Sequence, residues 1–229
     1  MAQLALADTL VWLDDTKPSN TASYTNRVQI KLSDETKWLT IPIAKKSIQG
    51  NLSEITSSEF NWQERHLSVI QRSFHNAPHK EHVIQLCKEV FHNNGLFETI
   101  VKSSETLARE FGVMPKNVFR ASTFNLESVG SERILEISRI LGATKYISGH
   151  GGFNYLDHNS FVNHGIDVEY LKYSLKPWKQ IGSSFTPFVT SLDILASNSP
   201  QNLKNYLIPM TTNWKTGKPR IENVLEVSE

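Results

Sequence analysis

The chain has 229 residues, of which 39% are hydrophobic and 21% charged, and its formal net charge is +1. This ordinary soluble composition and balanced charge argue against nucleic acid as a partner, because nucleic-acid binding depends on excess basic side chains. One cysteine, the lack of an apolar run of roughly 20 residues and the lack of a signal-peptide pattern lead us to expect a cytoplasmic protein without a disulfide or a membrane partner.

The N-terminal region is patterned as strands. Residues 7–15 have an apolar centre that ends in two carboxylates, which predicts a buried strand. Residues 27–32 and 38–43 alternate apolar and polar side chains on either side of a polar turn at 33–36. This pattern predicts a β-hairpin, whose second strand ends at an edge because of Pro42.

Helices and strands alternate in the rest of the chain. Helical periodicity and stop signals at Gly112 and Gly142 predict helices over residues 61–74, 78–93, 96–111 and 131–141, the last capped by Ser131. Short strands are predicted over residues 117–121, 145–148 and 167–173. The expected fold is therefore a single α/β domain over residues 1–210, with a mixed, partly parallel sheet flanked by helices and a polar tail over 211–229.

The strand at 145–148 opens into a loop that contains Gly149, Gly151 and Gly152. Its backbone amides could close on an anion, and ligands favour the carboxyl ends of strands in open α/β sheets. The spacing matches neither a dinucleotide-binding loop nor a Walker loop, and Ser148 lacks the frame of a nucleophile elbow. A tight structural turn is the alternative interpretation.

Histidines offer two further hypotheses. His75, His79 and His82 cluster in sequence, but Pro78 separates the first from the other two, so we expect no metal site and no cofactor. His66 follows Trp62 by one turn on the apolar face of its helix. It is either a hydrogen-bonded core residue or a functional residue that acts as a general base or donates a hydrogen bond to a substrate.

Acidic and basic residues flank the predicted hairpin. Asp14 and Asp15 could bind a magnesium ion or a sugar hydroxyl, or they could be solvated strand ends. Asn26 precedes Arg27, whose planar guanidinium could hold a phosphate or carboxylate. The alternative for Arg27 is a salt bridge to Asp14 or Asp15.

The C-terminal part of the chain carries an aromatic stretch around Gln180, which either lines a pocket or only packs. Ser191 and Asp193 have the pattern of a helix cap and first turn. Cys87 lies on the inward face of its helix and is interpreted as a core residue.

Many of these features occur in a characteristic order between about residues 7 and 193. They are Leu13-Asp14-Asp15, Asn26-Arg27, Trp38 to Pro42, Trp62 with His66, Phe74 with Ala77-Pro78, Arg133 to Leu135, Leu141 to Ala143, Tyr146 to Gly149 with Gly151-Gly152, Tyr155-Leu156, Gln180, Phe185 with Pro187, and Ser191 to Asp193. The set resembles the WbqC-like proteins of bacterial surface-polysaccharide loci. Members of that family usually open with a strand and a His-Gln-Pro motif, which we expect this chain to lack.

The resemblance implies an enzyme of surface-polysaccharide or nucleotide-sugar metabolism, with group transfer of an acyl or aminoacyl unit to an amino sugar as one reaction that would suit the site. The alternative is a non-catalytic ligand-binding or accessory protein of a glycan biosynthesis complex. The catalytic candidates are His66, Asp193 and Ser148. The candidates for binding a small-molecule substrate are Asp15, Asn26, Arg27, Gly149, Gly151, Gly152, Tyr155, Gln180 and Ser191, and the glycine loop is expected to share a cavity with Ser191 and Asp193.

Overall fold

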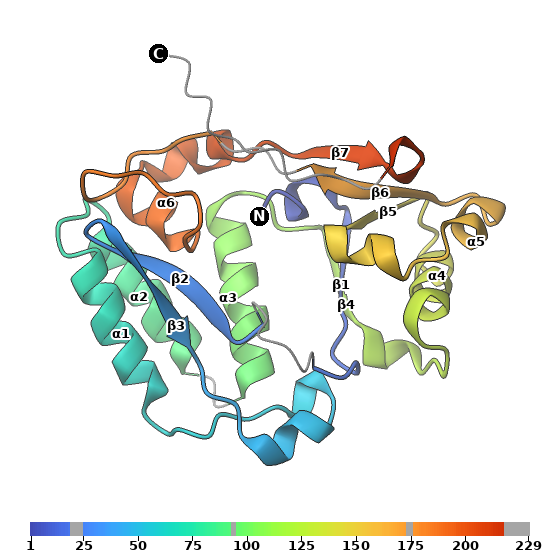
Figure 1. Cartoon of the computed structure of the whole chain (residues 1–229), viewed down its shortest axis with the longest axis horizontal. Coiled ribbons are helices and arrows are strands. Elements are labelled where there is room, and N and C mark those ends of the chain that lie inside the picture. Colours follow the sequence, from blue (N-terminus) through green and yellow to red (C-terminus); the bar gives the residue numbers. More distant parts are fainter. Residues whose placement is uncertain (19–24, 93–94, 173–175, 218–229) are drawn as a thin grey trace. The chain divides into compact units, whose positions relative to one another are not determined.

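The computed structural model of the chain describes residues 1–18, 25–92, 95–172 and 176–217. The chain divides into two compact units, coloured along the sequence in Figure 1. The sheet unit comprises Met1–Val11, Pro115–Lys176 and Leu207–Glu229, and the helical unit comprises Trp12–Met114 and Pro177–Tyr206. The predicted α/β class is confirmed, whereas the boundary between a domain over residues 1–210 and a tail stays a prediction.

The helical unit contains the predicted hairpin. Strands β2 (Arg27–Leu32) and β3 (Glu35–Thr40) pair antiparallel, from Arg27 opposite Thr40 to Leu32 opposite Glu35. The second strand starts earlier than predicted because the turn has only two residues, and Ser33 takes a φ of 56° within it. The hairpin itself is confirmed.

A loop from the C-terminal part of the helical unit closes on this turn. The Asp34 carboxylate accepts hydrogen bonds from the backbone amides of Ser184, at 2.9 Å, and of Ser183, at 2.7 Å. Gly182 has a φ of 97°, and a Cβ built on it would lie 2.5 Å from the carbonyl oxygen of Ser33. Only glycine satisfies both the left-handed backbone and this close approach.

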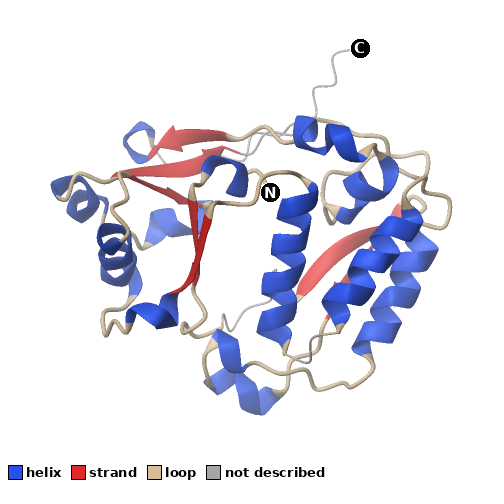
Figure 2. Ribbon diagram, turned by 180° about the vertical axis from the view of Figure 1, so that it is seen from behind, coloured by secondary structure: helices blue, strands red, loops and turns tan. Residues whose placement is uncertain are grey.

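Most of the buried hydrophobic residues described in the helical unit belong to helices, which Figure 2 draws in blue from behind. These helices are α1 (Trp62–Ser73), α2 (Lys80–Phe91), α3 (Leu96–Glu110) and α6 (Leu192–Ser197). The apolar face predicted for α1 is confirmed, because Val69, Ile70 and the neighbouring Phe74 are all buried. Helix α3 ends in a Schellman motif, in which Gly112 has a φ of 64° and the amide of Val113 donates to the carbonyl of Ala108.

The sheet unit holds a three-stranded mixed sheet. Strand β5 (Lys145–Ser148) runs parallel to β6 (Asp167–Lys172), which pairs antiparallel with β7 (Met210–Asn213). A second pair joins β1 (Thr9–Trp12) and β4 (Asn117–Arg120). The partly parallel sheet is confirmed. Strand β1 is half-buried rather than buried, and β7 lies largely within the stretch predicted as a tail, of which residues 218–229 are outside the described residues.

Two helices pack in the sheet unit, and they show where sequence patterns mislead. Helix α4 (Gly130–Ile140) starts after Val129, so the prediction that Ser131 caps it is wrong. The hydroxyl of Ser131 instead accepts a 2.8 Å hydrogen bond from the amide of Asp157. Asp157 in turn caps the short helix α5 (His158–Asn163), because its carboxylate accepts a hydrogen bond from the amide of Ser160. Ser131 therefore supports the residue that caps α5 and does not cap its own helix, α4.

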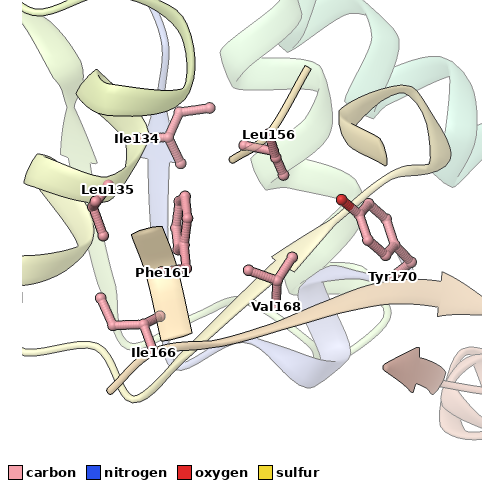
Figure 3. Packing of buried hydrophobic residues seen from close by; sticks show 7 residues of the cluster. All are labelled: Ile134, Leu135, Leu156, Phe161, Ile166, Val168 and Tyr170. Carbon is pink, nitrogen blue, oxygen red and sulfur yellow. The ribbon is translucent and has the colours of Figure 1, made fainter. Parts of the chain in front are cut away.

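The core of the sheet unit is an apolar cluster with members from α4, α5, β6 and the loops before and after α5. Figure 3 shows its buried members, which are Ile134, Leu135, Leu156, Phe161, Ile166, Val168 and Tyr170. Among the described residues, none of the helices combines the length and the apolar character that a bilayer crossing requires.

Candidate functional site

The helical unit contains a partly open cavity of about 300 Å³, at the lower end of the range of small-molecule sites. Its walls come from the hairpin, from α1, α2 and α3, and from the start of α6. The lining residues are Thr25, Asn26, Arg27, Val28, Leu39, Ile41, His66, Ile70, Leu86, Cys87, Val90, Phe91, Thr99, Ile100, Ser103, Ser104, Thr106, Leu107, Thr190 and Leu192. This cavity brings together three of the predicted site residues, namely Asn26, Arg27 and His66.

Helix α3 contributes a row of hydroxyl groups to the cavity. Thr99, Ser103 and Thr106 are spaced by four and three residues, so they lie on one helix face. The hydroxyl of Thr99 donates to the carbonyl of Gly95 at 2.9 Å, and that of Ser103 donates to the carbonyl of Ile100 at 3.0 Å. These residues were not among the sequence-predicted candidates, although their helical spacing can be read in the sequence.

His66 is the ionisable ring in the cavity wall. Its side chain is 5% exposed and lies edge-on to Trp62 and Phe91, with ring centroids 5.3 and 6.4 Å away. Nε2 lies 3.1 Å from the carbonyl oxygen of Thr40. A carbonyl oxygen only accepts, so Nε2 carries the proton and Nδ1 holds the lone pair of the neutral ring. Burial lowers the pKa of His66, which favours that neutral form.

Asn26 and Arg27 stand at the open end of the hairpin. The side-chain amide of Asn26 donates to the carbonyl of Ile41 at 2.9 Å, and the amide of Ile41 donates back to the carbonyl of Asn26. These bonds extend the hairpin by one pair beyond Arg27 and Thr40. Asn26 therefore both closes the hairpin and lines the cavity.

The guanidinium of Arg27 lies over the ring of Trp38, with Cζ 4.3 Å from the ring centroid. Strand register explains this contact, because Trp38 pairs with Gln29 and so shares a face with Arg27, opposite the face of Val28 and Leu39. Nε of Arg27 is buried and has no hydrogen-bond partner among the described residues. The role of Arg27 as an anion clamp stays a prediction.

Asp193 belongs to a different part of the helical unit. It is 2% exposed, its Oδ1 accepts a 2.6 Å hydrogen bond from the indole of Trp178, and burial raises its pKa. The amide of Gln180 is used by the backbone of Thr186, to which it donates at 2.8 Å and from which it accepts at 3.0 Å. Neither Asp193 nor Gln180 is among the described residues that line the cavity.

Lys31, which the sequence analysis did not select, joins this second cluster. Its side chain is 3% exposed, and Nζ donates to the side chain of Gln180 at 3.4 Å and to the carbonyl of Ser184. Ser191 is the N-cap residue of α6, and its side chain makes no capping bond. Ser191 lies between Thr190 and Leu192, which do line the cavity.

The two strand-end carboxylates lie near the start of the helical unit. Asp14 is buried and Asp15 is half-buried. The carbonyl of Asp14 accepts a 2.9 Å hydrogen bond from the amide of Ser53, which holds the chain against the 3-10 helix Leu52–Glu54. Asp15 is not among the described residues of the cavity lining, and its role in substrate binding stays a prediction.

The remaining candidates belong to the sheet unit, so a cavity shared with Ser191 and Asp193 stays a prediction. The glycine loop is folded as the 3-10 helix His150–Asn154, and the amide of Gly152 already donates to the carbonyl of Gly149 at 3.1 Å. A Cβ on Gly152 would lie 2.2 Å from Oγ of Ser148, which is buried, whereas one on Gly149 or Gly151 would meet nothing within 4 Å. Tyr155 follows with 54% of its surface exposed.

The histidine cluster has protein partners of its own. His82 pairs with Glu110 at 2.7 Å, and Nδ1 of His75 lies 3.0 Å from the carbonyl of Arg72. No group of three or more metal-ligating side chains occurs within the described part of the chain. Cys87 is a buried thiol in the cavity wall, and burial raises its pKa to about 12.

Comparison with known proteins adds family information. The sequence profile of the WbqC-like protein family matches residues 1–205, a range that includes every residue of the cavity lining. The uncharacterized protein Rv1507c of Mycobacterium tuberculosis (strain ATCC 25618 / H37Rv) is 22% identical over 198 residues, which cover 84% of each chain. No solved structure matches with significant similarity.

Proposed function

Because the chain belongs to the WbqC-like protein family, we propose that it is a cytoplasmic transferase of bacterial surface-polysaccharide metabolism, such as O-antigen or lipopolysaccharide biosynthesis. The proposed reaction moves an acyl or aminoacyl group onto the amino group of a sugar, for instance of a nucleotide sugar. The observation that carries this proposal is the neutral His66 ring in the wall of a cavity of about 300 Å³.

His66 suits the role of general base. Its Nε2 hydrogen bond to Thr40 fixes the ring and leaves the lone pair on Nδ1. In the proposed step, the amine nitrogen attacks the carbonyl carbon of an activated acyl donor such as a thioester. A C–N bond forms, the C–S bond breaks, the thiolate leaves with the bonding electrons, and His66 accepts the proton released by the amine.

A non-catalytic ligand-binding role is the second candidate. It is favoured by the partner of His66, because a backbone carbonyl orients the ring without the carboxylate that assists the histidine of many hydrolytic triads. Under this alternative, the cavity holds a ligand and His66 only donates to Thr40. The two candidates differ in whether the lone pair on Nδ1 is used.

The test is a transfer assay with purified protein, thioester donors and nucleotide amino sugars, read by mass spectrometry. His66→Gln retains a side-chain donor for Thr40 but removes the base, so we expect it to reduce turnover by roughly 10²- to 10⁴-fold while ligand binding is retained. His75→Gln is the matched control, because His75 is exposed. Binding without turnover in the unmodified protein, or unchanged turnover in His66→Gln, would favour the accessory role.

A further inference from the structure

We infer that the cavity of the helical unit receives a short, uncharged, apolar acyl group rather than an aminoacyl group or the phosphates of a nucleotide. This inference rests on the proposed function and narrows its donor. It is carried by the chemistry of the lining, which is apolar with neutral hydroxyl groups, and by the orientation of the one cation among the described lining residues.

The apolar part of the wall comes from every element around the cavity. Leu39 and Ile41 belong to the end of the hairpin, Val90 and Phe91 to α2, and Ile100 to α3. Transfer of an aliphatic chain from water to such a surface is favourable because it removes apolar area from water. A ligand group that fills this space is therefore favoured in proportion to its apolar surface.

The described lining residues offer no carboxylate to pair with a buried ammonium group. The described lining residues include no Asp or Glu. Glu105 is the carboxylate next to Ser104, but its Oε1 accepts from the indole of Trp12 at 3.2 Å and its Oε2 pairs with Arg109 at 2.9 Å. An unpaired charge is costly to bury, so the ammonium of an aminoacyl group is disfavoured.

The lining also offers little to an anion. Arg27 is the one cation among the described lining residues, and its guanidinium lies over Trp38, on the hairpin face opposite Val28 and Leu39. The buried His66 and Cys87 are neutral near pH 7, because burial lowers the pKa of the first and raises the pKa of the second to about 12. A phosphate or carboxylate inside the cavity would therefore have Arg27 as its one cationic partner among the described lining residues, and that guanidinium is already stacked on Trp38.

The hydroxyl row on α3 fits the one polar group that an acyl chain carries. An acyl carbonyl is a neutral acceptor, and a serine or threonine hydroxyl can donate to it without bringing a charge. The Ser103 hydroxyl already donates its proton to the carbonyl of Ile100, so Thr106, on the same helix face, is the residue that would donate to the acyl carbonyl, while the aliphatic chain packs against Ile100. The small volume suits a short chain, and the sugar and nucleotide would then remain outside the cavity.

The test measures equilibrium binding of three size-matched probes to the full chain, by titration followed with NMR. The probes are hexanamide, 6-aminohexanamide and hexanoate, which are neutral, cationic and anionic. We expect hexanamide to bind at least 10-fold more tightly than either charged probe. Equal or tighter binding of a charged probe, or no saturation by any of the three, would overturn the inference.

A charge placed in the lining gives the sharper test. Ser103 lies in the middle of α3 and is half-exposed, so the helix can accommodate Ser103→Asp. We expect this variant to lose at least 10-fold in affinity for hexanamide and to prefer 6-aminohexanamide. Ser103→Asn introduces a neutral side chain of the same shape as Asp, and we expect it to keep the preference for hexanamide. The same preference in both variants would show that the probes bind elsewhere and would also overturn the inference.

These binding measurements involve no transfer step, so their results can contradict the inference about the cavity without contradicting the proposed function. Preference for hexanamide without any transferase activity would contradict the proposed function and would still support the inference that the cavity binds a neutral apolar group. Transfer of aminoacyl groups, together with preferential binding of 6-aminohexanamide, would support the function and overturn the inference. Both results come from the same purified protein.

Discussion

The indole nitrogen of Trp178 donates a 2.6 Å hydrogen bond to Oδ1 of Asp193, and both side chains are buried. This contact joins the segment before α6 to the helix itself. Lys31 lies close enough to favour the charged form of Asp193, and it donates to Gln180, two residues after Trp178. Asp193, a catalytic candidate in the sequence, thus takes part in a buried hydrogen-bonded cluster.

The hydrogen bond predicts a specific cost for Trp178→Phe. The substitution leaves a buried carboxylate oxygen without its donor, and we expect the free energy of unfolding to fall by about 1–3 kcal/mol from this loss alone. Urea denaturation measures the change. Trp214→Phe is the matched control, because Nε1 of Trp214 is buried and has no hydrogen-bond partner among the described residues. Equal losses in the two variants would contradict the stabilising role of the Trp178 hydrogen bond.

The sequence predicted those parts of the fold that depend on local interactions. The glycine stops at Gly112 and Gly142 were predictable because a helix often ends with a left-handed residue, which glycine adopts without strain. The burial of His66 followed from helical spacing after Trp62. Strand β5 was predicted with its observed bounds, Lys145–Ser148.

Features that depend on distant partners were not predictable. Strand β7 has little apolar alternation. It forms a strand because it pairs with β6, which lies roughly 40 residues earlier in the sequence. The burial of Lys31 depends on Gln180 and Ser184, which lie about 150 residues away. The hydroxyl row of α3 could be read in the sequence, but its function depends on the cavity that other elements form.

The buried ring of His66 predicts a pH dependence of stability. Its pKa in the folded protein is lowered below the ordinary 6.5, chiefly by burial, so the unfolded chain binds the proton more readily. Stability is therefore expected to fall as the pH drops below about 6.5. His66→Gln removes this contribution, so the difference in unfolding free energy between wild type and variant should become less favourable to wild type from pH 7.5 to pH 5.5. A difference that is independent of pH would contradict this assignment.

Asp34 predicts the behaviour in acid. The amide of Ser184 and the hydroxyl and amide of Ser183 donate to this carboxylate and lower its pKa from 3.8 to about 2. A lowered carboxyl pKa stabilises the fold above the unfolded value, and that stabilisation is lost as the pH falls from about 4 to about 2. Asp34→Asn should therefore melt below wild type at pH 6, and the gap should narrow by pH 2. Ser183→Ala should reduce the same dependence in part, and a constant gap would contradict the prediction.

The glycine loop allows a structural role to be separated from a binding role. A Cβ on Gly152 would lie 2.2 Å from Oγ and 3.2 Å from Cβ of Ser148, whereas a Cβ on Gly151 has open space. We expect Gly152→Ala to destabilise the protein by about 1–3 kcal/mol, as overpacking does, and Gly151→Ala to leave the melting temperature nearly unchanged. Ser148→Ala removes the closest atom and should recover part of the loss in the double variant.

Loss of ligand binding in Gly151→Ala at unchanged stability would then reflect contact with the ligand, because its new methyl group meets nothing in the fold. Equal stability of the two single variants would mean that the loop adjusts to the extra Cβ.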